Sequence, residues 1–182
     1  LQDHLAVRSI PLIFLITPSK AAIYADRLDD RTVLRARRSL PGNYERLLPL
    51  LDRHGITYLD GHRLLAELRR SAPFPVFARS GSHWTEQAVV VVTRELVGRM
   101  GALLHRGLPP FRVLAEDVSP VPQFQDGDLA WLANLYTPEV FYEKEYRYPH
   151  YEAAAPAGGA AAPLKVAMVG GSFCYQLINA LT

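Results

Sequence analysis

Short apolar runs alternate with segments of helical periodicity along most of this chain. The run at residues 9–17 is rich in Ile, Leu and Phe and ends before Pro18, which is typical of a strand buried on both faces. By the same criteria we predict strands at 56–59, 74–78, 111–118 and 163–170, and helices at 42–55, 63–70, 85–104 and 126–135. Such alternation predicts an α/β fold, a three-layer sandwich built on a mostly parallel sheet.

Two of the predicted helices contain signals that begin, bend or end a helix. The helix at 42–55 has its apolar residues on one face and ends at a glycine, whereas Pro49 in its interior predicts a kink. The helix at 126–135 has Asp126 or Asp128 as its predicted N-cap, because a carboxylate there accepts hydrogen bonds from the free amides of the first turn.

Length and composition indicate one ordinary globular domain. The 182 residues are 49% hydrophobic and 21% charged, and a chain of this size buries roughly two thirds of its unfolded surface around one core. We therefore expect a single domain over residues 1–182, with the Ala-, Pro- and Gly-rich segment 152–163 as a surface loop. The chain starts without Met or a signal-peptide pattern and stops within an apolar helical run, so we expect both ends to be truncated.

Charge and residue usage exclude several classes of function. A net charge of +2 is too balanced for a nucleic-acid surface, and no run of about 18 apolar residues offers a transmembrane span. Cys174 is the only cysteine, which rules out an internal disulfide and a thiolate metal cluster, and the histidines lack metal-ligand spacing. We expect no nucleic acid, no metal and no cofactor.

Polar clusters follow three of the predicted strands. They are TPSK at 17–20, RSGSHW at 79–84 and GGSF at 170–173. If the strands are parallel, all three clusters lie at the carboxyl edge of one sheet, where α/β enzymes assemble their active sites. Ser172 follows two glycines at the start of a helix, a turn that exposes a hydroxyl beside free amide donors, and His83 is suited to act as its base.

Each of these residues also has a purely structural interpretation. Ser172 can be the N-cap of its helix, which is a frequent use of serine. His83 can be a core or loop histidine held by a backbone carbonyl, and Trp84 can serve packing alone. The residue types by themselves leave the catalytic and structural interpretations open.

Five segments, in this order, resemble the SGNH-hydrolase-like domain of the alginate O-acetyltransferases AlgJ and AlgX and their relatives. They are LIFLITPSKAAIYAD, HGITYLDGHRLL, RSGSHWTEQA, GDLAWLANL and VGGSF. Together they cover most of the chain. The resemblance implies an SGNH-hydrolase-like fold with a permuted motif order, in which the histidine block precedes the nucleophile block, as His83 precedes Ser172 here.

Carried over to this chain, the resemblance implies that Ser172 is the nucleophile and His83 its base. The family's acid normally stands two residues before the histidine, and that position is Gly81. The Asp often found just before the nucleophile is likewise replaced, by Gly171. If no other acid supports His83, we expect Gly81→Asp to speed turnover.

The supporting group for His83 and the rest of the site are therefore open at this point. Glu86, Asp60 and a backbone carbonyl are the candidates for holding His83, beside a dyad without any acid. Gly171, Arg79, Trp84 and Lys20 are predicted to line the site or its oxyanion pocket.

The resemblance implies O-acetyl transfer to a bacterial exopolysaccharide of the alginate type, or acetylesterase chemistry of the same kind. An acetyl-enzyme would form on Ser172 and be resolved by a sugar hydroxyl or water. It further implies a periplasmic or otherwise extracytoplasmic location, a membrane anchor in a missing N-terminal segment, and a membrane-bound acyltransferase as the acetyl source. The alternative is a catalytically degenerate carbohydrate-binding or scaffold protein of a polysaccharide biosynthesis complex.

Overall fold

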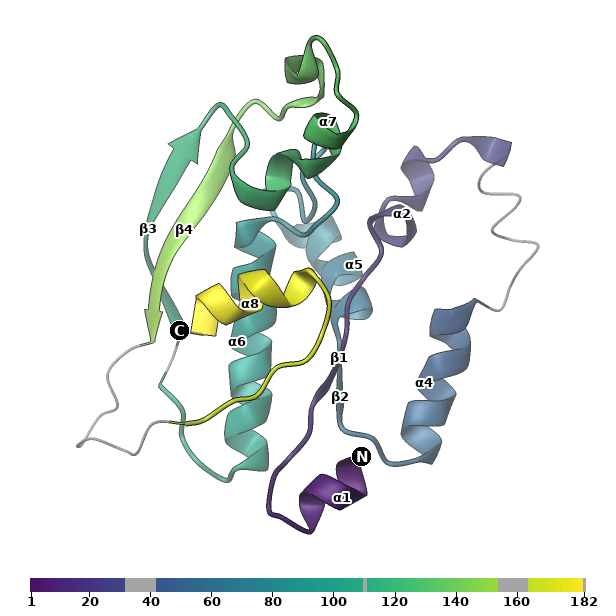
Figure 1. Cartoon of the computed structure of the whole chain (residues 1–182), viewed down its shortest axis with the longest axis vertical. Helices are drawn as coiled ribbons and strands as arrows, with labels where there is room; N and C mark the ends of the chain where they lie inside the picture. The colour runs from purple at the N-terminus through teal and green to yellow at the C-terminus, as the bar shows by residue number, and fades with distance from the viewer. Residues whose placement is uncertain (32–41, 110, 154–163, 182) are drawn as a thin grey trace. The chain divides into compact units, whose positions relative to one another are not determined.

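Residues 1–31, 42–109, 111–153 and 164–181 are described by the computed structural model of the chain (Figure 1). The chain divides into two units, Leu1–Ala66 and Glu67–Thr182, which we describe separately. The single domain expected from the length stays a prediction. The predicted loop at 152–163 lies outside the described residues except for positions 152 and 153, which end a strand.

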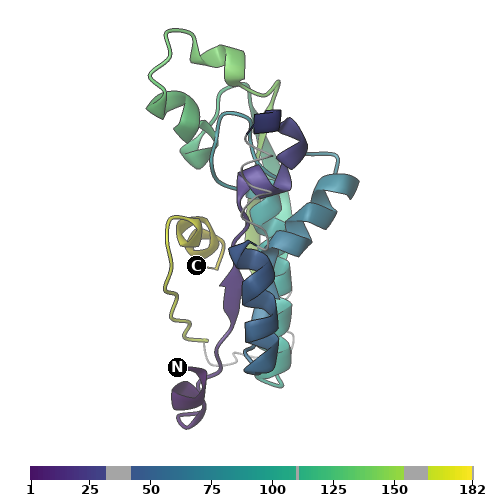
Figure 2. The ribbon, with the colours of Figure 1, turned by 90° about the vertical axis from the view of Figure 1, so that its right-hand side faces the viewer.

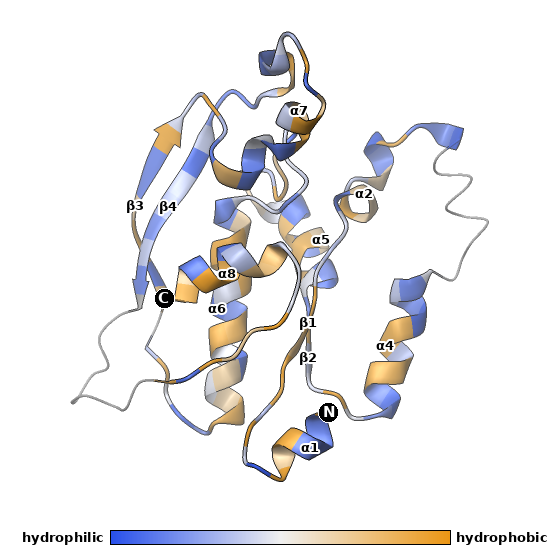
Figure 3. Ribbon diagram, in the orientation of Figure 1, coloured by the Kyte–Doolittle hydropathy of each residue, from blue (hydrophilic) through white to orange (hydrophobic). Residues whose placement is uncertain are grey.

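The first unit contains a pair of short parallel strands. β1 (Phe14–Ile16) and β2 (Tyr58–Asp60) pair with Phe14 opposite Tyr58 and Ile16 opposite Asp60. β1 consists of three apolar residues and is orange in Figure 3. The helices described in this unit are α1 (Gln2–Ala6), α2 (Lys20–Ile23), the 3-10 turn η1 (Ala25–Arg27), α4 (Asn43–Arg53) and the beginning of α5 (Gly61–Ser71).

The predicted helix at 42–55 is confirmed as α4. Pro49 lies inside it, and Gly55 follows its end with a φ of 59°, a conformation that glycine adopts without the steric cost of a Cβ. The amide of Ile56 donates to the carbonyl of Leu51, which closes the last turn. The predicted strand that begins at residue 56 is confirmed in part, because β2 starts two residues later.

In the second unit, the long helix α6 (Glu86–Leu103) packs against both a hairpin and the last helix. The hairpin is the antiparallel pair β3 (Phe111–Ser119) and β4 (Tyr146–Ala153), with an irregularity between Val113 and Ala115, and the last helix is α8 (Phe173–Leu181). The hairpin lies behind α6 in Figure 2. Short helical turns complete the unit: η2 (Phe124–Gly127), α7 (Asp128–Leu132) and η3 (Pro138–Phe141).

The core of the second unit forms around the first half of α6. Thr85 caps this helix by accepting a hydrogen bond from the amide of Ala88. The helix then buries a run of small and β-branched side chains, visible as orange along α6 in Figure 3. The buried residues of α6 are Ala88, Val89, Val90, Val92, Thr93 and Leu96.

Two predicted strands are absent, and both errors have a physical reason. Residues 74–78 form only one bridge, between Phe77 and Trp84, because the prolines at 73 and 75 have no amide hydrogen for a strand ladder. Residues 164–170 form neither strand nor helix. Val166 is 50% and Val169 is 99% exposed, so these side chains are not buried against a neighbouring strand.

Strand pairing in the described residues therefore differs from a mostly parallel sheet. It consists of one parallel and one antiparallel two-stranded sheet. The segments that follow predicted strands three and five cannot meet at the edge of a common sheet, since neither strand forms. In the part of the chain that the structure describes, no helix is long and apolar enough to span a bilayer.

Candidate active site

A loop between Val76 and Thr85 presents His83 directly before α6. The amide of Thr85 donates to the carbonyl of Val76 at 3.1 Å, and the hydroxyl of Thr85 donates to the carbonyl of Pro75 at 2.8 Å. These bonds close the loop at its base. His83 lies in this loop directly before the buried Trp84, and the residue is 9% exposed. Its imidazole nevertheless reaches polar side chains outside the loop.

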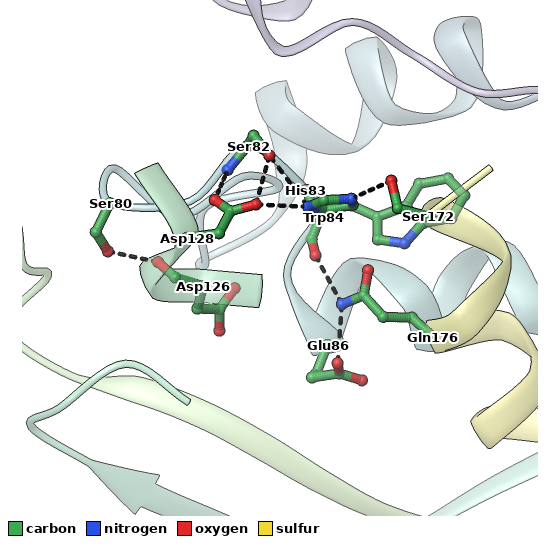
Figure 4. Close-up of polar contacts among 9 residues, drawn as sticks. All are labelled: Ser80, Ser82, His83, Trp84, Glu86, Asp126, Asp128, Ser172 and Gln176. Carbon is green, nitrogen blue, oxygen red and sulfur yellow. Dashed lines mark hydrogen bonds and ion pairs between the residues drawn. The ribbon is translucent and has the colours of Figure 1, made fainter. Parts of the chain in front are cut away.

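His83 contacts the serine at the start of α8. Its Nε2 lies 2.7 Å from Ser172 Oγ, so the predicted proximity of these two residues is present across 89 positions of sequence. The imidazole also packs on Phe173, with ring centroids 4.7 Å apart. Ser172 itself is exposed, so a substrate has access to its hydroxyl. Figure 4 shows the two side chains pointing toward each other.

The other imidazole nitrogen contacts Asp128, the first residue of α7. His83 Nδ1 lies 2.9 Å from Asp128 Oδ2 (Figure 4). Ser82 donates to the same carboxylate through its amide and through its hydroxyl, at 2.6 Å each. Burial alone would raise the pKa of Asp128, but the hydrogen bonds from Ser82 and His83 outweigh it and hold that pKa below its ordinary value. Asp128 is therefore an ionised partner for the imidazole at neutral pH.

Asp128 corrects two sequence predictions. The N-cap of α7 is Gly127, and neither Asp126 nor Asp128 caps that helix through its side chain. The group that holds His83 is Asp128, not Glu86, Asp60 or a backbone carbonyl. Asp60 belongs to the first unit, where its carboxylate accepts from Tyr44.

Ser80 fixes α7 against the histidine loop. Its carbonyl accepts from the amides of Leu129 and Ala130, at 3.0 and 3.1 Å. Its hydroxyl donates to the carbonyl of Asp126 at 2.6 Å and lies 2.7 Å from the hydroxyl of Tyr146. Because Ser80 is buried, these bonds form away from water and hold Asp128 at a constant distance from His83.

Comparison with known proteins decides the family. The family model described as "SGNH hydrolase-like domain, acetyltransferase AlgX" matches residues 1–179. The chain belongs to this family. A comparison of this chain with curated proteins found no match.

The structure is also similar to a solved structure, the O-acetyltransferase domain of AlgJ from Pseudomonas putida. The TM-score is 0.56 at 19% sequence identity, and the match covers 84% of this chain and 53% of the AlgJ chain. This chain thus spans about half the length of that structure. The similarity confirms the predicted α/β fold of SGNH-hydrolase type.

The family acid position, Gly81, has no room for a side chain. A Cβ there would lie 2.5 Å from the carbonyl oxygen of Gln125 and 2.9 Å from the Cα of Asp126, and both are backbone atoms that cannot move aside. The close approach of the 125–126 backbone is what brings Asp128 to His83. In this chain the carboxylate that contacts His83 therefore comes from the start of α7.

We expect Gly81→Asp to unfold or displace α7 rather than to speed turnover, which reverses the expectation from sequence. The side chain must push the Gln125 backbone away, so melting temperature and ester hydrolysis should both fall. A thermal unfolding curve together with a rate on p-nitrophenyl acetate checks this. A stable variant with faster hydrolysis would contradict the close packing described here.

Gln176 links α8 to the same loop from the other side. One turn after Ser172, its Nε2 donates to the carbonyl of Trp84 at 3.1 Å and to Glu86 Oε1 at 2.8 Å (Figure 4). The residue is 3% exposed. Ser172, His83 and Asp128 thus lie on three segments. The buried Ser80 joins the histidine loop to α7, and the buried Gln176 joins the same loop to α8.

The remaining predicted site residues have different surroundings. Trp84 is fully buried and packs edge-to-face on Phe173, at 4.9 Å between ring centroids, so its contacts are those of a core residue. The guanidinium of Arg79 lies over the ring of Phe141, 5.6 Å from its centroid. A Cβ on Gly171 would meet nothing within 4 Å, which leaves open space beside Ser172. Lys20 begins α2 in the first unit, and its role in the site stays a prediction.

No group of three or more potential metal ligands occurs among the described residues. A buried carboxyl group, that of Asp126, lies two residues before Asp128 in the sequence. Asp126 is 3% exposed, and its Oδ1 has no hydrogen-bond partner among the described residues. Burial, and next the negative charge of Glu86, raises the pKa of Asp126 to about 7, although a hydrogen bond from Tyr148 opposes the rise.

Asp126→Asn should change how stability depends on pH. The raised pKa of Asp126 means that its protonated form suits the fold; its contribution is fully present below about pH 4 and is lost as pH rises through about 7. The amide of the variant cannot ionise. Its free energy of unfolding should therefore rise by a few kcal/mol relative to that of the wild type between about pH 4 and pH 7. Chemical unfolding of both proteins at pH 4 and pH 8 measures this difference, and a difference independent of pH would contradict it.

Proposed function

We propose that this chain transfers acetyl groups to hydroxyls of a polysaccharide, or hydrolyses the same esters, through a Ser172–His83–Asp128 triad. The observation that carries the proposal is the unbroken chain of contacts from Ser172 Oγ to His83 Nε2 at 2.7 Å and from His83 Nδ1 to Asp128 at 2.9 Å. Membership of the SGNH-like acetyltransferase family supports the reaction class. The carboxylate of Asp128 beside His83 supports this proposal over the degenerate-protein alternative, which assumed that the acid was lost.

In the first half-reaction, Ser172 Oγ attacks the carbonyl carbon of an acetyl donor while its proton passes to His83 Nε2. Asp128 accepts the Nδ1 hydrogen, which fixes the tautomer and stabilises the imidazolium that forms. His83 then returns the proton to the leaving group as the carbonyl–donor bond breaks, and an acetyl ester remains on Ser172. The negative charge on the carbonyl oxygen would be met by amides at the start of α8, those of Ser172 and Phe173, because the first amides of a helix lack intrahelical acceptors.

In the second half-reaction, a sugar hydroxyl gives its proton to His83 and attacks the acetyl ester. Ser172 leaves and takes the proton back, so the enzyme is restored. Water in the place of the sugar gives hydrolysis by the same steps. The open space beside Gly171 supports the approach of an acceptor. We further propose an extracytoplasmic location and a membrane-bound acyltransferase as the source of the acetyl group, both on the strength of the family.

Acetyl transfer can be tested with p-nitrophenyl acetate as donor and an oligosaccharide mixture as acceptor. Release of p-nitrophenol reports the first half-reaction, and mass spectrometry of the sugars separates transfer from hydrolysis. We expect release well above the uncatalysed rate, with acetyl on the sugar for a transferase and as acetate for an esterase. A rate equal to that of buffer alone would contradict both activities.

A further inference from the structure

A second feature of this unit is a groove of about 440 Å³ next to the triad. Residues from α6, α8, the hairpin and the segment before α7 line it, among them Glu86, Asp117, Phe124, Tyr148, His150 and Asn179. Glu86 is the first residue of α6, three positions after His83. Asn179 lies about two helical turns after the N-terminus of α8, so about 10 Å of helix axis separates it from Ser172.

Phe124 is held at the groove in a strained and exposed conformation. Its φ is 49°, a left-handed value that is a genuine outlier for a bulky aromatic residue. The ring is not there to fill the core, because the residue is 65% exposed. Its edge-to-face contact with Tyr148, at 6.0 Å between centroids, fixes the direction of the ring. Strain that burial does not repay points to a role in contacting a ligand.

The rest of the lining is rich in hydrogen-bonding groups and negative in charge. Glu86 is partly buried, and its carboxylate accepts a hydrogen bond from Gln176 at 2.8 Å. Asp117 is paired with His150 at 2.7 Å. An anion entering the groove would therefore meet the carboxylates of Glu86 and Asp117.

We propose that this groove binds an uncharged sugar unit of the acceptor polysaccharide, near the unit that receives the acetyl group. The face of a sugar ring is apolar and fits the exposed ring of Phe124, whereas its hydroxyls match the carboxylate and amide groups around it. A uronic acid unit would place its own carboxylate against Glu86 and is disfavoured. Binding away from the reacting hydroxyl orients that hydroxyl toward the acetyl-enzyme. The acceptor part of this inference rests on the proposed function.

Binding can be measured without any acetyl donor by titrating the full chain with three hexasaccharides in a calorimeter. Cellohexaose and mannohexaose are the neutral probes, and a mannuronate hexamer is the charged one. We expect at least one neutral probe to bind, and the mannuronate hexamer to bind at least tenfold more weakly. Equal or tighter binding of the mannuronate hexamer, or no binding of either neutral probe, would overturn the proposal.

Phe124→Gly separates a ligand-binding role from a structural one. Glycine suits the positive φ of this position, so the variant should have an unchanged or higher melting temperature. Its affinity for the neutral hexasaccharide should nevertheless fall at least tenfold. Tyr136→Ala is the matched control, because Tyr136 is a fully exposed aromatic residue that does not line the groove, and its affinity should be that of the wild type. Unchanged affinity in Phe124→Gly would overturn the role of the ring.

Glu86→Gln tests the selection against charge. The amide still offers an oxygen to Gln176 but no longer repels an anion, so the preference for neutral over mannuronate hexamer should shrink severalfold. An unchanged preference would overturn the electrostatic argument. Failure of the groove proposal can be told apart from failure of the triad proposal. Turnover of p-nitrophenyl acetate without sugar binding overturns only the groove, and sugar binding without turnover overturns only the proposed catalysis.

Discussion

Ser172→Ala is expected to reduce p-nitrophenyl acetate turnover to the background rate while the protein stays folded. The hydroxyl of Ser172 supplies the bond-forming oxygen, and its hydrogen-bond partner is His83 Nε2 at 2.7 Å. In a well-studied serine protease, loss of the nucleophile costs on the order of 10⁶ in kcat. If Ser172 served only as a helix cap, its loss would cost about 1 kcal/mol of stability and leave turnover unchanged.

Ser119→Ala is the matched control for this experiment. Ser119 lies at the end of β3, where its hydroxyl bonds to the backbone of Val121. We expect wild-type turnover from this variant. A Ser172→Ala protein with the same rate as Ser119→Ala would refute the role of Ser172 as nucleophile.

Asp128→Asn is expected to lower turnover by about 10⁴, the effect of the equivalent change in the well-studied protease triad. The amide presents an NH₂ group where Ser82 or His83 now meets a carboxylate oxygen, so the imidazole loses the partner that fixes its tautomer. KM for the small ester should change little, because the carboxylate stabilises charge that develops in the transition state. Steady-state kinetics of the variant separate the two parameters.

Asp60→Asn makes the same chemical change in the first unit and serves as the control. The carboxylate of Asp60 accepts from Tyr44 and from the amide of Arg63. Wild-type kcat in Asp60→Asn, beside a large loss in Asp128→Asn, is the expected pattern. The reverse pattern would restore Asp60 as the acid and exclude Asp128.

The sequence was sufficient to find Ser172 and His83, although the structural reason for their meeting was wrong. We expected them at the carboxyl ends of strands in one sheet, but neither strand forms. His83 instead lies just before α6 and Ser172 just before α8, and these two helices pack together in the second unit. The family resemblance paired Ser172 with His83, although the apolar periodicity predicted strands that do not form before either residue.

Asp128 was missed because its position invites another explanation. An Asp at the beginning of a helix is ordinarily a cap, and Glu86 and Asp60 were nearer to the expected motif position of the acid. The partner of His83 is 45 positions away and is brought there by the contact between Gly81 and the 125–126 backbone. The available signal was the GDLAWLANL segment, which resembles the family but had no role assigned to its Asp.

The short strands were misjudged for a different reason. An apolar run of five to eight residues predicts burial, but it does not say whether a neighbouring strand is present to pair with it. Pro73 precedes residues 74–78 and Pro75 lies within them, which prevents a ladder, and residues 164–170 leave Val169 almost wholly exposed. The long helix α6 and the strand β3 were predicted well, because eighteen residues and nine residues of consistent pattern leave few alternatives.

Labelling with a fluorophosphonate probe tests the central proposal most directly. The probe reacts with a serine only when a base activates its hydroxyl, so it reports the nucleophile without reference to donor, acceptor or polymer. After digestion, mass spectrometry should place one label on Ser172, at a rate that falls strongly in Asp128→Asn and is unchanged in Asp60→Asn. A protein that stays unlabelled, or that is labelled at another serine, would contradict the triad proposed here.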